Sequence, residues 1–248
     1  MALQEELEQQ GNWLFRHRSY LPLVVLIIGL MVYLFNKYYN EEYIFNKEPY
    51  ENYLLWGSLM VSLCGFFIRV YTVGYTPKNT SGRNTKEGQV AEVLNTRGMY
   101  SVVRHPLYLG NFLLWLGPAM LTGQIWFIIS FILFYWIYYE RIMFAEEQFL
   151  RKIFGQKYLD WSENVPAFLP KIKNFKKNNL LFNWKKVIYK ERNGFSALFI
   201  IFCTFDILGK TIQGRTDYNY YLIIVCVFAL FIHILLKILK KTTRLFSE

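Results

Sequence analysis

The sequence is poor in the residues that build metal sites and disulfide frameworks. It has three cysteines and three histidines among 248 residues. Cys64, Cys203 and Cys226 all lie inside apolar stretches and lack the short spacings typical of metal ligands. We therefore expect no metal site, and we interpret the three cysteines as small apolar residues buried among helices.

Acidic residues are also scarce, with 18 Asp and Glu against 28 Lys and Arg, which gives a net charge of +10. An excess of this size can indicate a nucleic-acid-binding protein. However, 54% of the residues are hydrophobic and 19% are aromatic, which is too apolar for an ordinary soluble domain. We therefore expect a membrane-embedded protein with no nucleic-acid partner.

Long apolar runs are what the sequence has instead. Six segments have the composition of membrane-spanning helices, which need about 20 mostly apolar residues. They are residues 20–35, 53–75, 107–122, 125–144, 195–208 and 220–239. Since backbone polar groups inside lipid must be paired within their own segment, each run is expected to be a helix. The expected fold is all-α, a polytopic helical membrane protein with about six spans.

The distribution of basic residues predicts the orientation of these spans. If the N-terminus is cytoplasmic and all six segments cross, 23 of the 28 Lys and Arg residues lie on the cytoplasmic side. Four lie on the opposite side, and Arg69 lies inside the second span. Cytoplasmic loops of membrane proteins carry such an excess of Lys and Arg. We therefore expect both termini in the cytoplasm, with the protein in a bacterial inner membrane or, in a eukaryote, the endoplasmic reticulum.

The chain divides into three parts. Residues 1–50 hold a polar start and the first span, and residues 51–170 hold three spans and the polar motifs. Residues 171–248 hold a basic linker, residues 171–192, and a two-span hairpin. A further amphipathic helix is expected at the membrane surface after the fourth span and is predicted to end at Gly155.

Arg104, His105 and Pro106 stand at the start of the third span. Proline suits the first turn of a helix, so the two preceding cations would lie at the positive end of that helix. Free N–H groups and cations together make an anion site. Taken alone, the motif is explained equally well by anchoring to lipid headgroups.

A short turn at residues 122–124 adds a second group to this site. It predicts an antiparallel pair of helices, which would bring His105 close to Glu146 and Glu147. A cationic site that faces a carboxylate suits an amino-acid zwitterion, such as the one at the end of S-adenosylmethionine. Aromatic walls are expected from Tyr100, Tyr108 and Trp115. The residues thus predict a zwitterion pocket at the cytoplasmic face, and they leave the cofactor open.

Four motifs in order resemble one known superfamily. They are the run from Gly98 to Gly110, Glu146-Glu147-x-x-Leu150, Phe154-Gly155-x-x-Tyr158 and Val165-Pro166-x-x-Leu169-Pro170. Over about 75 residues this pattern is similar to the isoprenylcysteine carboxyl methyltransferases and phospholipid methyltransferases. The resemblance implies a helical membrane enzyme that binds S-adenosylmethionine from the cytoplasm and methylates a lipid-borne acceptor.

The resemblance also implies roles for individual residues. The positions implied to bind the cofactor are Gln89, Glu92, Val93, Leu94, Asn95, Tyr100, His105, Pro106, Leu107, Tyr108 and Glu146. Catalytic roles are expected for Arg104 and Glu147, the latter or Glu140 as a base if the acceptor needs one. Arg141 matches only loosely the arginine that the carboxyl methyltransferases place near their substrate.

Two further arginines are candidates for the acceptor. Arg69 either extends its side chain to the interface or faces the cavity and meets an anionic headgroup. In the second case Arg83 in the adjacent polar loop would join it. The residues for substrate binding are therefore Arg69, Arg83 and Arg141, and the C-terminal hairpin inherits no role from the resemblance.

The resulting prediction is S-adenosylmethionine-dependent methyl transfer to a membrane lipid or lipidated substrate, with an anionic headgroup such as a lipid phosphate or carboxylate first among acceptors. Methylation of phosphatidylethanolamine or of a prenylcysteine carboxyl group comes next. In another enzyme class, an NADPH-dependent sterol or lipid reductase carries a similar Arg-His-Pro module. A membrane scaffold or sensor is the alternative that is not an enzyme. The oligomeric state stays open.

Overall fold

A computed structural model describes residues 2–18, 20–39, 43–77 and 91–242. In these ranges the regular structure is helical apart from one isolated bridge between Gly98 and Lys176. The α-helices are α1 Leu3–His17, α2 Leu21–Tyr39, α3 Tyr50–Gly74, α4 Pro106–Leu121, α5 Ile125–Phe154, α6 Gln156–Ser162, α7 Trp184–Ile212 and α8 Tyr220–Thr242. Short 3-10 helices η1 Ile44–Asn46, η2 Met99–Ser101 and η3 Ile172–Asn174 lie between them.

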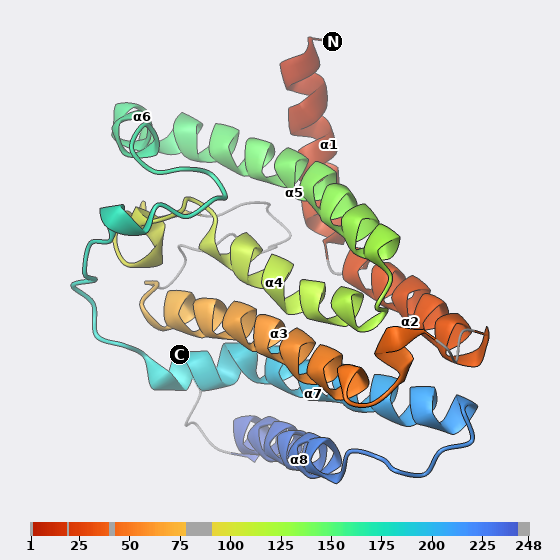
Figure 1. Cartoon of the computed structure of the whole chain (residues 1–248). Helices are drawn as coiled ribbons and strands as arrows, with labels where there is room; N and C mark the ends of the chain where they lie inside the picture. Colours follow the sequence, from red (N-terminus) through yellow and green to blue (C-terminus); the bar gives the residue numbers. More distant parts are fainter. Residues whose placement is uncertain (1, 19, 40–42, 78–90, 243–248) are drawn as a thin grey trace.

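The helices form a bundle in which α3 and α4 lie in the middle, with α5 on one side and α7 on the other (Figure 1). Within the described residues, five helices, α2, α3, α5, α7 and α8, are long and apolar enough to cross a membrane, while α4 is apolar but shorter. Each of the six predicted segments falls on one of these helices. The predicted fold class, a polytopic helical membrane protein, is confirmed.

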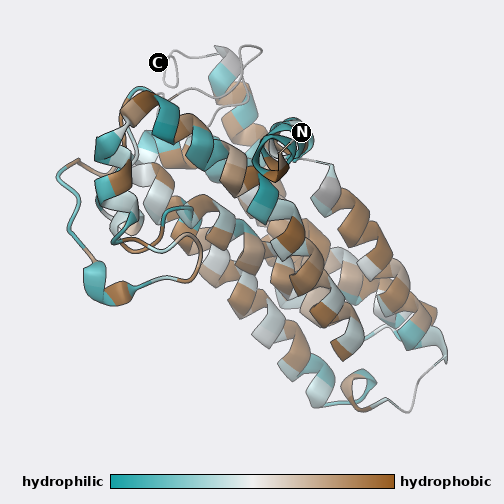
Figure 2. Ribbon diagram, turned by 90° about the horizontal axis from the view of Figure 1, so that it is seen from above, coloured by the Kyte–Doolittle hydropathy of each residue, from teal (hydrophilic) through white to brown (hydrophobic). Residues whose placement is uncertain are grey.

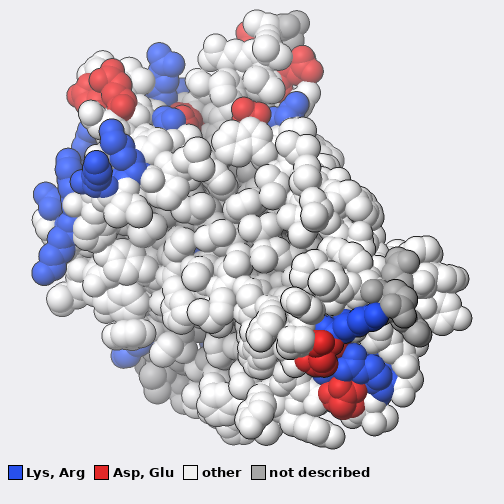
Figure 3. All heavy atoms as spheres, in the orientation of Figure 1, with Lys and Arg blue, Asp and Glu red and all other residues white. Residues whose placement is uncertain are grey.

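The outer surface of the bundle has the character of a lipid-facing surface. Hydrophobic residues run along the long helices, and hydrophilic residues gather in α1, α6 and the connecting segments (Figure 2). On the face shown in Figure 3, charged residues collect at opposite ends of the molecule and leave a band without charge between them. Helices that lie in lipid need such a band, because charge in hydrocarbon is costly.

Three predicted boundaries need correction. The polar N-terminal stretch forms a helix, α1, which packs against α5. The fourth span and the expected surface helix are one continuous helix, because α5 runs without a break to its cap at Gly155. The second half of the predicted linker belongs to α7, which starts at Trp184 because the Asn183 side chain caps the backbone N–H of Lys186.

Close packing of α3 on α4 depends on two glycines. A Cβ atom added to Gly65 would lie 2.5 Å from the carbonyl oxygen of Gly110. A Cβ atom on Gly110 would lie 2.6 Å from Cγ of Arg69. Gly110 therefore lets the two helices touch and also leaves the space that the Arg69 side chain occupies.

The turn between α4 and α5 has the predicted geometry. Gly123 has a φ of 65°, a left-handed conformation that glycine adopts without strain. Its carbonyl oxygen accepts a hydrogen bond of 2.6 Å from the hydroxyl of Tyr43. This turn makes α4 and α5 antiparallel neighbours, so the start of α4 lies beside the second half of α5.

Candidate functional site

The segment that leads into α4 is held from outside the helix. The backbone N–H of Arg104 donates to the carbonyl of Pro166 at 2.8 Å, and that of His105 donates to Ala167 at 3.2 Å. Lys171 returns a backbone hydrogen bond to Val102 at 3.0 Å. The motif after α6 therefore fixes the chain on which Arg104 and His105 stand, which explains why the two motifs occur together.

His105 lies between the two carboxylates that follow it in the sequence. Its Nε2 is 2.9 Å from Oε1 of Glu147, and its Nδ1 is 3.5 Å from Oε2 of Glu146. A neutral imidazole carries a hydrogen on one nitrogen only. Two carboxylates facing both nitrogens therefore favour the doubly protonated imidazolium.

The pKa of His105 reflects this arrangement. Burial by itself would lower the pKa, because it disfavours the charged ring, but the contacts with Glu146 and Glu147 outweigh burial and raise the pKa to about 9. At neutral pH His105 is a cation and not a general base. For the nearby Tyr100 burial acts in the opposite direction and raises the pKa, so its phenol stays protonated.

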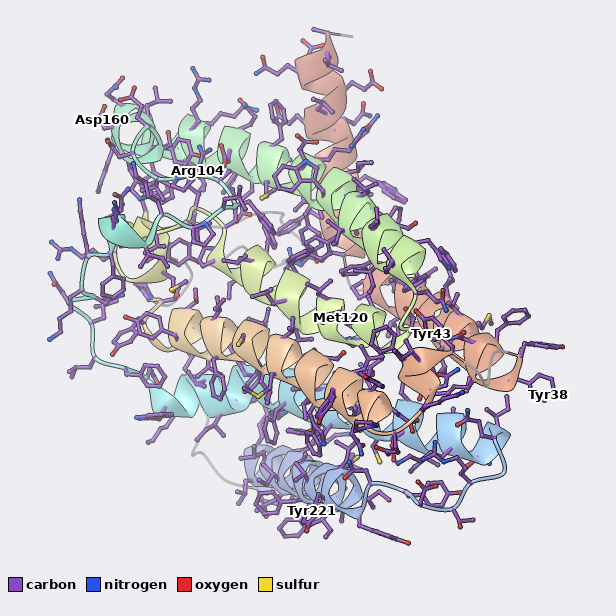
Figure 4. All side chains as sticks on the ribbon, in the orientation of Figure 1. Tyr38, Tyr43, Arg104, Met120, Asp160 and Tyr221 are labelled. Carbon is purple, nitrogen blue, oxygen red and sulfur yellow. The ribbon has the colours of Figure 1, made fainter. Side chains whose placement is uncertain are left out.

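The two carboxylates have further partners. Oε2 of Glu147 accepts a hydrogen bond of 2.9 Å from Nη1 of Arg104, and Oε2 of Glu146 accepts one of 2.9 Å from the hydroxyl of Tyr108. The labelled Arg104 lies beside the C-terminal part of α5 (Figure 4). Arg104, His105 and Tyr108 are thus joined to one face of α5 through Glu146 and Glu147.

A cavity of about 470 Å³ opens beside this network. Its lining comes from five parts of the chain: the residue after α1, the side of α3, the segment before α4 together with α4 itself, the C-terminal part of α5 with α6, and the start of α7. The lining residues are Arg18, Arg69, Val73, Ala91, Val93, Leu94, Asn95, Tyr100, Arg104, His105, Pro106, Leu107, Tyr108, Asn111, Glu146, Phe149, Leu150, Tyr158, Trp161, Tyr189, Lys190 and Glu191.

Most of the predicted site residues meet in this cavity. Eleven of them line it, namely Arg69, Val93, Leu94, Asn95, Tyr100, Arg104, His105, Pro106, Leu107, Tyr108 and Glu146. Glu147 does not line the cavity but holds Arg104 and His105 from behind. Gln89 and Arg83 lie outside the described residues.

Other predicted residues lie elsewhere. Arg141 faces α1, where its Nε donates to the side chain of Gln10 at 2.9 Å, and Glu92 and Glu140 are exposed away from the cavity lining. Trp115 was expected in the aromatic wall, and that expectation is wrong. It packs between the two apolar cores of the bundle, and Trp161 of α6 lines the cavity instead.

Arg69 is held inside the protein, which rules out simple extension of its side chain to the interface. Its Nε and Nη2 donate to the two carboxylate oxygens of Glu191 at 2.9 and 2.8 Å. Its Nη1 donates to Oδ1 of Asn111 at 2.5 Å. These contacts join α3, α4 and α7 at the part of the cavity wall that lies away from His105 and Glu146.

Sequence reasoning missed Glu191, Asn111, Arg18 and Trp161. Glu191 is the one acid in the basic stretch from Lys171 to Arg192, and this isolation is a signal that could have marked it. Arg18 follows α1, whose helical character was not predicted. The site therefore draws on both ends of the chain as well as on its middle.

The arrangement suits a ligand that carries both signs of charge. Arg104 offers hydrogen-bond donors to a carboxylate, the protonated His105 adds positive charge beside it, and Glu146 offers an acceptor to an ammonium group. Nε of Arg104 is buried and has no hydrogen-bond partner among the described residues. Aromatic side chains of Tyr100 and Trp161 provide flat apolar walls. Fold and site together define a multi-pass helical membrane protein with a cavity at one end of the bundle whose described lining carries both signs of charge.

The chain is similar in sequence to known membrane methyltransferases. Residues 54–157, which include most of α3 and all of α4 and α5, match the phospholipid methyltransferase family. The chain is 36% identical over 80 residues to the protein-S-isoprenylcysteine O-methyltransferase of Schizosaccharomyces pombe, covering 32% of this chain and 34% of that protein. It is 26% identical over 140 residues to the Tribolium castaneum enzyme of the same name, covering 56% and 50%.

A bacterial relative extends the comparison. The methanethiol S-methyltransferase of Pseudomonas deceptionensis is 35% identical over 76 residues, which is 30% of this chain and 28% of that protein. The chain thus spans half or less of the length of these relatives. This part of the chain is therefore similar to the integral membrane methyltransferases that include the isoprenylcysteine O-methyltransferases and the phospholipid methyltransferases.

Proposed function

We propose that this chain transfers a methyl group from S-adenosylmethionine to an anionic oxygen of a lipid-borne acceptor, a phosphate or a carboxylate. The observation that carries the proposal is the network of His105 with Glu146 and Glu147 at the wall of a 470 Å³ cavity. The family match supports methyl transfer, and the positive-inside distribution of Lys and Arg supports a cytoplasmic position for the cavity.

The residues present fit S-adenosylmethionine. Arg104 would hold its carboxylate, with the charge of His105 nearby, and Glu146 would hold its ammonium group. Tyr100, Tyr108 and Trp161 are expected to contact the adenine and the sulfonium, since a cation is attracted to the face of an aromatic ring. When bound, the cofactor supplies an electrophilic methyl group, whose transfer forms a C–O bond while the S–C electron pair returns to sulfur.

The protonation states favour an anionic oxygen over an amine or a hydroxyl. A phosphate or carboxylate can accept a methyl group without losing a proton, whereas the other acceptors need a general base. His105 is protonated, and both oxygens of Glu147 are engaged by Arg104 and His105. Of the two carboxylates in the described lining, Glu146 is bound by Tyr108 and Glu191 by Arg69. The residues therefore contribute mainly proximity, orientation and exclusion of water.

The relatives bear on which anionic oxygen is used. Two of them carry the name of isoprenylcysteine O-methyltransferase, which favours a carboxylate on a lipidated cysteine. The excess of positive charge around the cavity suits a lipid phosphate equally well. Both acceptors present the same chemistry, an anionic oxygen at the end of a hydrocarbon chain.

A methyl-transfer assay tests the proposal. Membranes that contain the full chain are incubated with methyl-labelled S-adenosylmethionine and with an S-prenylcysteine, a phosphatidic acid, a phosphatidylethanolamine or methanethiol. We expect label in one of the two anionic acceptors and none above background in membranes with the Glu146→Ala variant. Label only in phosphatidylethanolamine or in a volatile thioether would overturn the assignment of the acceptor. Absence of label from all four would overturn methyl transfer to these classes.

A further inference from the structure

The second half of the cavity is separate from the residues assigned to the cofactor. Along α3 the cavity wall continues from Val73 to Arg69, and along α4 it continues from Tyr108 to Asn111. Residues of α7 close this part of the wall, among them Glu191. An acceptor that reacts with a methyl group in the first half of the cavity would place its reacting end beside this second half.

Arg69 has donors left for a ligand in this position. A guanidinium group has five N–H donors, and three of those on Arg69 are used by Glu191 and Asn111. The two others are one on each terminal nitrogen. The Arg69 side chain keeps 22% of its surface exposed, while that of Glu191 keeps 4%. Both residues line the cavity, and the arginine is the more accessible of the two.

We propose, on the basis of the proposed function, that Arg69 binds the anionic group of the acceptor and that Glu191 is its positioning residue. The planar fork of an arginine matches phosphate and carboxylate oxygens. Glu191 accepts hydrogen bonds from one edge of the guanidinium and so fixes the direction of the N–H donors that remain. The C-terminal hairpin thereby becomes part of the acceptor site.

The charges around the cavity agree with an anionic ligand. Its described lining includes the cations Arg18, Arg69, Arg104, His105 and Lys190 against the carboxylates of Glu146 and Glu191. Glu191 neutralises Arg69, and Glu147 behind the lining offsets part of the charge of Arg104 and His105, but the five named cations still outnumber the three carboxylates. A bidentate pair also holds a long side chain in one orientation, which lowers the entropy lost when a ligand binds.

A second ion pair on the same helix provides a matched control. Lys210 and Asp206 of α7 lie 2.9 Å apart, and each side chain is 5% exposed. Neither residue lines the 470 Å³ cavity. Breaking this pair shows how the loss of a buried ion pair in α7 alone affects the measured affinities, because neither residue lies in the proposed acceptor site.

The experiment measures binding by the full chain in detergent micelles. The probes are a short-chain phosphatidic acid, an N-acetylated S-farnesylcysteine and S-adenosylhomocysteine, and the variants are Glu191→Gln, Glu191→Asp and Asp206→Asn. We expect Glu191→Gln to weaken binding of the anionic probe at least tenfold and to change the Kd of S-adenosylhomocysteine less than twofold. Glu191→Asp should restore part of the lost affinity, and Asp206→Asn should leave both affinities unchanged. The preferred probe identifies the acceptor as phosphate or carboxylate.

Several results would overturn the proposal. They are wild-type protein that binds neither anionic probe, a Glu191→Gln variant with the wild-type affinity for the probe, and an equal loss of probe and S-adenosylhomocysteine binding in the Glu191 variants. A charge-swapped protein, Arg69→Glu with Glu191→Arg, should be more stable to heat than Glu191→Gln but should bind the probe no better than that variant. Probe affinity restored to the wild-type value would show that the pair is only structural.

Failure of the proposed function gives a different result, namely binding of the probe without methyl transfer.

Discussion

The pKa of His105 makes the stability of this protein depend on pH in a defined direction. The pKa is raised from 6.5 to about 9 in the folded protein. Since one pKa unit corresponds to about 1.4 kcal/mol, about 3 kcal/mol of folding free energy is linked to the proton on this ring. Because the folded pKa lies above the unfolded one, this contribution is fully present below about pH 6.5. It is lost as the pH rises through about 9.

Thermal unfolding of the purified chain in micelles between pH 6 and pH 10 tests this linkage. Lysines and tyrosines titrate in the same range, so the informative quantity is the difference between wild type and His105→Asn. The difference in unfolding free energy should shrink by about 3 kcal/mol on going from pH 6 to pH 10. Parallel curves for the two proteins would refute the account of His105 as an imidazolium held between Glu146 and Glu147.

Two other predictions concern packing and the far end of the bundle. Glu51→Gln should lower the free energy of unfolding by about 3–5 kcal/mol, because it leaves the buried Lys37, whose side chain is 2% exposed, without the carboxylate that lies 2.6 Å away. A denaturant titration measures this change. Glu48→Gln, at an exposed position, should cost far less in the same titration. Gly110→Val should lower the unfolding temperature and weaken probe binding together, because the new side chain would need the space of Arg69; an unchanged protein in both assays would contradict the close packing of α3 on α4.

The sequence was sufficient for the part of the site that one hairpin builds. A turn of three residues makes α4 and α5 antiparallel neighbours, and this places His105 close to Glu146 and Glu147. The pairing of each His105 nitrogen with a different carboxylate could not be predicted in the same way. It depends on the rotation of α5 about its axis, which is set by packing against α1 and α4.

The contribution of α7 could not be predicted from the sequence. Apolar composition marks only the lipid-facing length of a helix, so the polar turns from Trp184 to Gly194 gave no signal of a span. Arg69 and Glu191 are 122 positions apart, and no local pattern specifies that α7 returns to the side of α3. That contact is a property of the bundle, held at its other end by the pairing of Arg215 with Glu51 at 2.7 Å.

The central claim is that the cavity beside His105 binds S-adenosylmethionine, and calorimetry with its product tests it most directly. S-adenosylhomocysteine and NADPH are titrated separately into the purified wild-type chain and into His105→Ala and Glu146→Ala variants. The account predicts saturable binding of S-adenosylhomocysteine to the wild type, loss of that binding in both variants and no binding of NADPH. Binding of NADPH without S-adenosylhomocysteine, or unchanged binding of S-adenosylhomocysteine to both variants, would contradict it.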